Sequence, residues 1–227
     1  MKPLYFLVFW CSFIFATGEA AAQKPLAPLP PAEVSDAAPE APIPVASSAP
    51  ADVVASAVAA VGKLGDEVVL GRFQVAVDRM NPAWKERTAK RMGGMDKLDE
   101  QLAGVARQMV QQGISMISFK PTGQPRSFEV SPGRKVQKIN GVEVEQLVFN
   151  RWLVLVPTET KFRILREGEP KPLVIDSTGF QVAISDKAKN DWTFIDGSGL
   201  TVNDLRSLYA TLPQDLTLPP LSKKESR

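Results

Sequence analysis

The hydrophobic pattern of this chain changes period once, at Gly113, and this change constrains the class of fold. Before it, apolar residues recur every three to four positions, which is the spacing of a helix face. After it, apolar and polar residues alternate, as along a strand. Short turns join the alternating segments, so we expect an antiparallel sheet. Helices followed by a meander predict an α+β domain whose helices pack on one face of the sheet.

Three helices are predicted before Gly113. Asn81 is a good N-cap and Pro82 suits a first helical turn, so a new helix is expected to begin there. Gly93 and Gly94 interrupt the helical pattern, and Gly113 is placed to end the last helix. The predicted helices span 66–80, 82–92 and 95–112.

The part after Gly113 is predicted to consist of short strands and one last helix. Asn140–Gly141 suits a tight hairpin, and 177–179 and 186–190 have the composition of turns. Thr201 and Asp204 have the spacing of a capping box, which predicts a short helix over 202–212. The predicted strands span 115–121, 126–132, 135–147 (a hairpin), 151–165, 171–177, 180–186 and 191–196.

The N-terminus has the pattern of a secretory signal peptide. One lysine precedes an apolar run from Leu4 to Ala16, and Ala20 and Ala22 are placed as an A-x-A cleavage site. The run is shorter than the roughly 20 residues that a membrane-spanning helix needs. We therefore predict that residues 1–22 are cleaved, that the protein is exported to the periplasm or secreted, and that no integral membrane segment remains. A retained anchor is the alternative.

The remaining chain divides by composition into three parts. Residues 23–60 begin with a long run rich in alanine and proline, which offers too little apolar area to offset the entropy of ordering, so we predict a disordered linker there. Residues 61–221 are long enough for one domain with one core. Residues 222–227 are predicted to be a charged tail.

The residue types that are absent exclude several kinds of chemistry. Cys11, in the leader, is the only cysteine, and the chain has no histidine. Disulfides, cysteine catalysis, thiolate metal sites and serine–histidine systems are therefore excluded from the mature chain, and we expect neither a metal nor a cofactor. The formal net charge is only +2, and basic residues are interleaved with acidic ones, so we expect no nucleic-acid partner.

The order of elements and the ending FQVAISDKAKNDWTFIDG (180–197) resemble the nuclear-transport-factor-2-like (NTF2-like) fold, the SnoaL-like and cystatin-like α+β cup. The ending is most similar to that of exported bacterial NTF2-like proteins of unassigned role, in which a strand is followed by a polar turn, a W-x-F-I/V-D strand and a short helix. The resemblance covers roughly residues 64–213.

This resemblance implies a conical pocket between the concave face of the sheet and the helices. Relatives use such a pocket for isomerase or dehydratase catalysis, for binding small molecules, or for protein assembly. Enzymatic relatives commonly place an aspartate, tyrosine or histidine inside the cup. This chain has no histidine, and its tyrosines are Tyr5, in the leader, and Tyr209.

Asp196 is the residue with two competing interpretations. On a strand it shares a face with Trp192 and Phe194, and an aspartate among aromatic side chains can act as a general base. It also stands directly before a Gly–Ser–Gly turn, where a carboxylate accepts backbone N–H groups. We favour the turn-capping role for Asp196, and for Asp176 by the same argument.

The aromatic residues leave the function open between two classes. If Trp84, Trp152 and Trp192 line the cup, they stack on an apolar small molecule; if they fill the core, they do not, and we favour core filling. The leading hypothesis is an exported, non-catalytic NTF2-like binding or assembly module of the cell envelope, with an apolar small molecule, an envelope protein or a second copy held through the sheet as partner. The alternative is an isomerase- or dehydratase-type enzyme that uses a carboxylate of the cup. We predict no catalytic residue, and the candidate ligand-binding residues are Trp84, Trp152, Trp192, Phe194 and Asp196.

Overall fold

The computed structural model describes residues 48–131, 133–139, 142–165 and 171–226; the predicted leader, most of the predicted linker and the Asn140–Gly141 turn lie outside them. The described chain is an α+β domain, as the change of period predicts. Its helices are α1 (Ala51–Val69), α2 (Gln74–Asp78), α3 (Pro82–Met92), α4 (Met95–Gln111) and α5 (Val202–Leu208). Its strands are β1 (Ile114–Pro121), β2 (Arg126–Val130), β3 (Arg134–Ile139), β4 (Val142–Leu147), β5 (Arg151–Ile164), β6 (Leu173–Asp186), β7 (Thr193–Asp196) and β8 (Ser222–Ser226).

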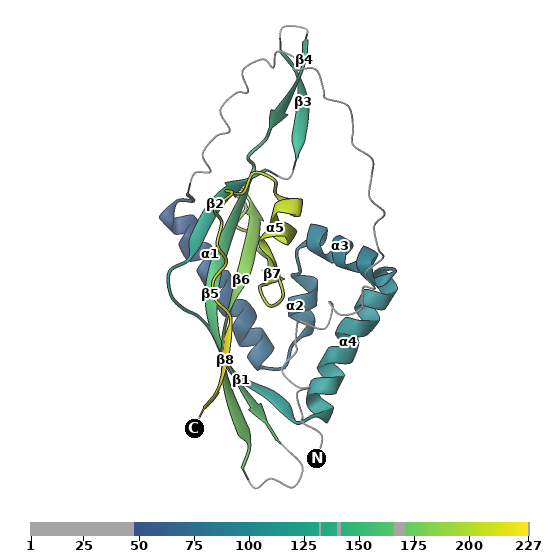
Figure 1. The fold of residues 1–227 in the computed structure, drawn as a ribbon, viewed down its shortest axis with the longest axis vertical. Helices are drawn as coiled ribbons and strands as arrows, with labels where there is room; N and C mark the ends of the chain where they lie inside the picture. The colour runs from purple at the N-terminus through teal and green to yellow at the C-terminus, as the bar shows by residue number, and fades with distance from the viewer. Residues whose placement is uncertain (1–47, 132, 140–141, 166–170, 227) are drawn as a thin grey trace, which may run out of the picture. The chain divides into compact units, whose positions relative to one another are not determined.

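β5 and β6 form the centre of the main sheet. They pair over their full lengths, from Arg151 opposite Asp186 to Ile164 opposite Leu173. β1 and β2 share the other edge of β5, and β7 and β8 share the other edge of β6. β3 and β4 pair with each other in a separate two-stranded sheet (Figure 1). All strand pairs are antiparallel, which confirms the prediction.

α1 covers one face of the main sheet, which we call the α1 face. It lies mainly against β1 and also reaches β5 and β6. Its close approach depends on Gly65, because a Cβ there would lie 2.2 Å from the Phe119 ring of β1. The buried apolar residues of α1 recur at helical spacing and are Ala57, Val61, Leu64 and Val68.

The predicted boundary between linker and domain was wrong. α1 begins at Ala51, so residues 51–60, which we assigned to the disordered linker, are helical. Alanine has the highest helix propensity, and the stripe that buries Val61 and Val68 already includes Ala57. Alanine-rich composition favours helix wherever apolar residues recur at helical spacing and prolines are absent.

The first predicted helix, 66–80, was also wrong in extent. α1 ends at Val69 and α2 begins only at Gln74, because Gly71 has a φ of +78°, which lies in the left-handed region. The break is a Schellman motif. In it the Gly71 amide donates to the Val68 carbonyl at 2.9 Å and the Arg72 amide donates to the Glu67 carbonyl at 3.0 Å.

The predicted start of α3 and the predicted breaks on either side of α4 are confirmed. The Asn81 side chain caps α3 by accepting a hydrogen bond from the Trp84 amide at 3.2 Å, and Pro82 occupies the first turn. Gly93, with a φ of +87°, ends this helix, and Gly113, with a φ of +63°, follows α4.

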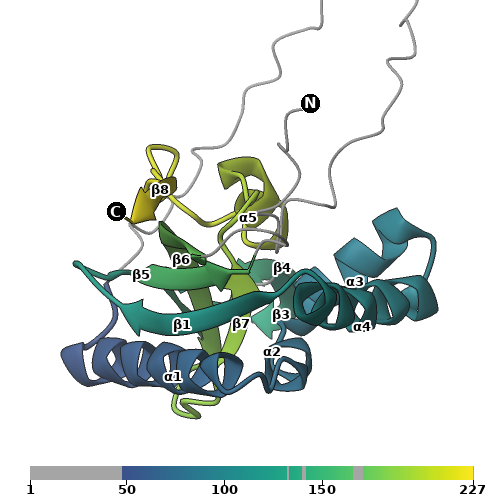
Figure 2. The same cartoon turned by 90° about the horizontal axis from the view of Figure 1, so that it is seen from below.

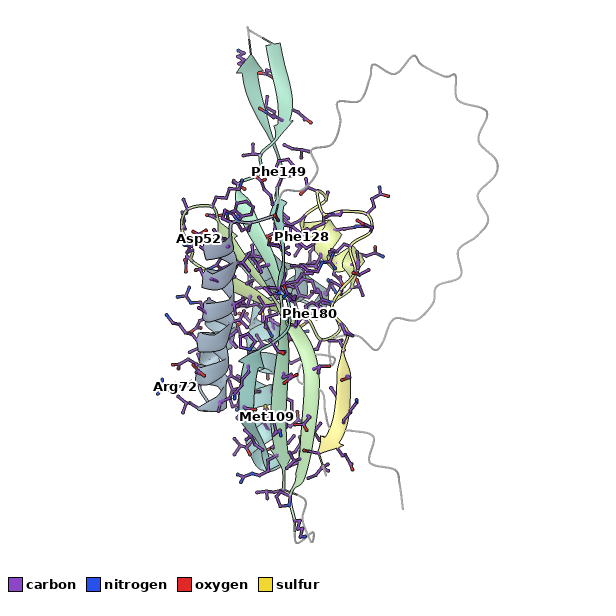
Figure 3. The ribbon with its side chains drawn as sticks, turned by 90° about the vertical axis from the view of Figure 1, so that its left-hand side faces the viewer. Asp52, Arg72, Met109, Phe128, Phe149 and Phe180 are labelled. Atoms are coloured by element: carbon purple, nitrogen blue, oxygen red, sulfur yellow. The ribbon has the colours of Figure 1, made fainter. Side chains whose placement is uncertain are left out.

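α5 and the chain after it cover the opposite face of the main sheet, which we call the α5 face (Figure 2). The prediction that the helices pack on one face was therefore wrong. The middles of β5 and β6 are apolar at successive positions, so both of their faces need cover. Phe128 and Phe180, labelled in Figure 3, belong to the core on the α5 face. The other members are Val130, Leu153, Leu155, Val182, Ile184, Ile195, Leu200, Leu205, Tyr209, Leu212 and Leu216.

β6 replaces two predicted strands. We expected a turn at 177–179, but these residues continue the strand and lie opposite Thr158–Thr160 of β5. The turn composition is overridden because β5 offers an unbroken row of hydrogen-bonding groups along the whole segment. β6 is consequently long enough to accept two strands on its outer edge.

The predicted charged tail is not a free tail. Ser222–Ser226 forms β8, which pairs with β6 from Ser222 opposite Thr178 to Ser226 opposite Val174. β7 covers only Gln181–Ile184 of the same edge, so the rest of that edge is open to the end of the chain. β8 thus pairs with the part of the β6 edge that β7 leaves open.

Candidate functional site

The five candidate ligand-binding residues do not converge on one site. Strand pairing places Trp152 and Phe194 on the α1 face, because each is in register with a β6 residue of that face. Asp196 lies on the same face, opposite Gln181. Trp84, on α3, packs instead against the core of the α5 face. The five residues therefore do not line a single cup.

Trp192 and Phe194 are buried side chains of the core. Their exposed fractions are 4% and 7%. The Trp192 Nε1 group donates a hydrogen bond to the Ser56 hydroxyl of α1 at 3.0 Å, which satisfies its buried polar atom. The core-filling interpretation is confirmed for Trp192, and Phe194 is buried as well.

Trp84 and Trp152 are half-buried, and each lies under a cation. The Arg91 guanidinium is 5.4 Å from the centre of the Trp84 ring, and the Lys187 ammonium is 4.5 Å from that of Trp152. Both distances suit cation–π contacts. Lys187 also binds the Glu129 carboxylate, so the cation above Trp152 is itself held in place.

Asp196 caps the turn that follows β7, as predicted. Its Oδ2 atom accepts hydrogen bonds from the Ser198 amide, at 3.2 Å, and from the Ser198 hydroxyl. Its Oδ1 atom accepts a hydrogen bond from Gln181 Nε2 at 2.9 Å. Both carboxylate oxygens are thus occupied by the protein's own donors, which opposes a role as general base.

We expect Asp196→Ala to lower the free energy of unfolding by about 1–2 kcal/mol, because the Ser198 amide and Gln181 then lose their acceptor. Asp196→Asn keeps an acceptor and should cost less than the alanine variant. Urea denaturation of the two variants checks this. Equal or higher stability of Asp196→Ala would contradict the capping role.

Asp176 does not cap a turn, so that prediction was wrong. It lies within β6, and its carboxylate pairs with the Lys161 ammonium of β5 at 3.1 Å. Hydrogen bonding from Lys161, and then from Ser226, holds the pKa of Asp176 below its usual value. Asp176 therefore interacts with a residue of each strand beside β6, Lys161 of β5 and Ser226 of β8.

A cleft of about 380 Å³ lies between the start of α3 and the ends of β5 and β6, and sequence reasoning missed it. Asp186 is central to it, accepting hydrogen bonds from Arg151 Nε at 3.0 Å and from Lys189 Nζ at 3.1 Å. The other lining residues are Asn81, Pro82, Ala83, Glu86, Ile184, Ser185, Asp191 and Thr193. The sequence signal was the charged run DKAKN, which we interpreted only as a turn.

The charges of this cleft are largely neutralised within the protein. Hydrogen bonding from Lys189, together with the Arg151 guanidinium, holds the pKa of Asp186 below its usual value against the opposing effect of burial. Burial alone would lower the pKa of Arg151, but the neighbouring Tyr209 hydroxyl and Asp186 raise it. Asp191 pairs with Arg79 at 2.5 Å. The central carboxylate of the cleft, Asp186, is therefore held by two cations of the protein itself.

No cluster of carboxylates among the described residues has the arrangement of a metal site. None of the helices placed by the structure has the length and apolar character needed to cross a membrane.

Comparison of the chain with protein-family models, with curated proteins and with solved structures found no match.

Proposed function

We propose that the protein is an exported, non-catalytic binding or assembly module of the cell envelope. The observation that carries this proposal is that the chain's own elements cover both faces of the main sheet. α1 packs on one face and α5 with the following chain packs on the other, so the aromatic residues near β7 are core and not pocket. The buried aromatic side chains pack within the protein, and the carboxylates at the ends of β6 and β7 accept hydrogen bonds from its own donors. Such a chain is suited to act through its surface.

The charged groups support the same proposal. Asp196 has both oxygens engaged, and Asp186 is shared between two cations. A general base needs a lone pair directed at the substrate and a pKa tuned toward neutrality. These aspartates have the partners of structural carboxylates, and this favours the binding module over an isomerase- or dehydratase-type enzyme.

We further propose that the fold is a member of the NTF2-like group. Four helices before the sheet, a long antiparallel β5–β6 pair and the strand–turn–strand–helix ending support this assignment. The placement of α5 and β8 differs from a simple cone with helices on one side.

Native mass spectrometry of the protein released from cells tests the proposed function. We expect the subunit to lack residues 1–22, so that it begins at Gln23, because Ala20 and Ala22 form the predicted cleavage site. We expect the intact species to be heavier than one subunit, through a second copy, an envelope protein or a bound apolar molecule. Recovery of a lone subunit with an intact leader from the cytosol would overturn the proposal.

A further inference from the structure

β8 covers a segment of β6 that carries little protection of its own against pairing with another chain. The segment is Val174–Thr178, and it contains no lysine, proline or change of register. The opposite edge of the sheet does carry such features. β1 has a register shift between Met116 and Ser118 and ends in Lys120 and Pro121. Edge strands of natural proteins are commonly protected by bulges, lysines and prolines.

β8 itself is held mainly by polar contacts. Its residues are exposed or half-exposed, so its pairing buries little apolar surface. The Thr178 and Ser222 hydroxyl groups are 2.8 Å apart, and Lys224 lies opposite Asp176. Elements with few buried apolar contacts open at a small fraction of the free energy of global unfolding. We therefore expect β8 to leave β6 while the core stays folded.

The chain before β8 is well anchored and then extends. Leu216 is buried in the core of the α5 face, and Arg126 donates a hydrogen bond to the Thr217 carbonyl at 3.0 Å. Pro219 and Pro220 follow, and prolines favour an extended connection without backbone donors. A released β8 would thus project from a folded body on a short, stiff connection.

The charges decide which strand of a second copy fits the open edge. If the segment paired antiparallel with its own copy about its centre, Asp176 would face Asp176, and like charges directly opposite are destabilising. If β8 of the second copy takes the edge, Lys224 again faces Asp176 and every native contact of β8 is restored. Exchange of an identical element is a low-cost route to a dimer.

We propose that two copies of this chain exchange β8, each β8 pairing with Val174–Thr178 of the other copy. The resulting dimer is reciprocal and closed, and it continues the sheet of each copy with a strand from its partner. This inference rests on the proposed assembly function and names the partner as a second copy. Its test uses purified chain alone, so its failure leaves export and binding of other molecules to be judged separately.

The test mixes two full-length variants, both carrying Cys11→Ser. One, labelled with ¹⁵N, carries Thr178→Cys, and the other, unlabelled, carries Ser222→Cys. The two are refolded together at high concentration and oxidised. Because Thr178 and Ser222 are in contact, we expect a disulfide-linked dimer of mixed isotopic mass, whose yield rises with protein concentration.

Two controls make the result decisive. Replacing Ser222→Cys by Ser226→Cys moves the thiol to the position opposite Val174, so the yield of mixed dimer with Thr178→Cys should fall severalfold. A single chain carrying both Thr178→Cys and Ser222→Cys should form the bridge internally when dilute. Internal bridging without mixed dimer, or equal mixed-dimer yields for the two cysteine positions on β8, would overturn the exchange. If no internal bridge formed, the pairing of Thr178 with Ser222, on which the proposed exchange depends, would be wrong.

Discussion

Trp192→Ala is expected to lower the free energy of unfolding by about 3–5 kcal/mol, the usual cost of truncating a buried large aromatic side chain. Trp192 is only 4% exposed, and it lies between the sheet and α1 with its Nε1 group bonded to Ser56. Urea or thermal denaturation measures the change, and the melting temperature should fall by about 2–4 °C for each kcal/mol.

Two matched variants separate packing from hydrogen bonding. Trp192→Phe keeps most of the ring and loses the bond to the Ser56 hydroxyl, so it should cost about 1–3 kcal/mol. Trp152→Ala removes a half-buried tryptophan and should cost less than Trp192→Ala. If Trp192→Ala instead left stability near that of the parent chain, Trp192 would line a cavity, and the ligand-binding interpretation would replace the core-filling one.

Asp204→Ala is expected to cost about 2–3 kcal/mol, because one carboxylate serves two structures. Its Oδ2 atom accepts hydrogen bonds from the Thr201 amide, at 3.1 Å, and from the Thr201 hydroxyl, at 2.6 Å, which completes the predicted capping box of α5. Its Oδ1 atom lies 3.3 Å from Arg91 and 3.6 Å from Arg87, which joins α5 to α3. Chemical denaturation near neutral pH measures the loss.

The same residue predicts a dependence of stability on pH. Burial would raise the pKa of Asp204, but the Thr201 hydrogen bonds and the two arginines outweigh it and hold the pKa below its usual value. A carboxyl group with a lowered pKa stabilises the fold above the pKa of the unfolded chain, about 3.9, and loses that contribution as the pH falls through the folded value. The difference in stability between the parent chain and Asp204→Ala should therefore be full above about pH 5 and shrink below about pH 4. A constant difference across that range would contradict the role of the ionised carboxylate.

Local signals predicted the starts of α3 and α5 and the end of α3, but α5 ends at Leu208 and not at the predicted Leu212. The capping by Asn81, the stop at Gly93 and the Thr201–Asp204 box depend on residues within one turn of each other, and all are confirmed. The core-filling role of Trp192 and the turn-capping role of Asp196 were likewise within reach of the sequence.

Features that depend on distant partners were missed. The 177–179 segment has the composition of a turn, and only its pairing with β5 makes it a strand. The tail becomes β8 because β6 extends beyond β7, which no local pattern reveals. The cleft around Asp186 was missed for the same reason, since α3 and the end of β6 are brought together by the fold.

The central β5–β6 pair has a consequence for the order of folding. Ile164 and Leu173, which lie opposite each other, are close in sequence, so closing this hairpin costs less chain entropy than bringing Ile114 of β1 opposite Ile164. Contacts between residues close in sequence form fastest. We expect the two longest strands to meet first and to serve as the template on which β1, β2, β7 and finally β8 assemble, so the strand nearest the end of the chain is the last to join and the first to leave.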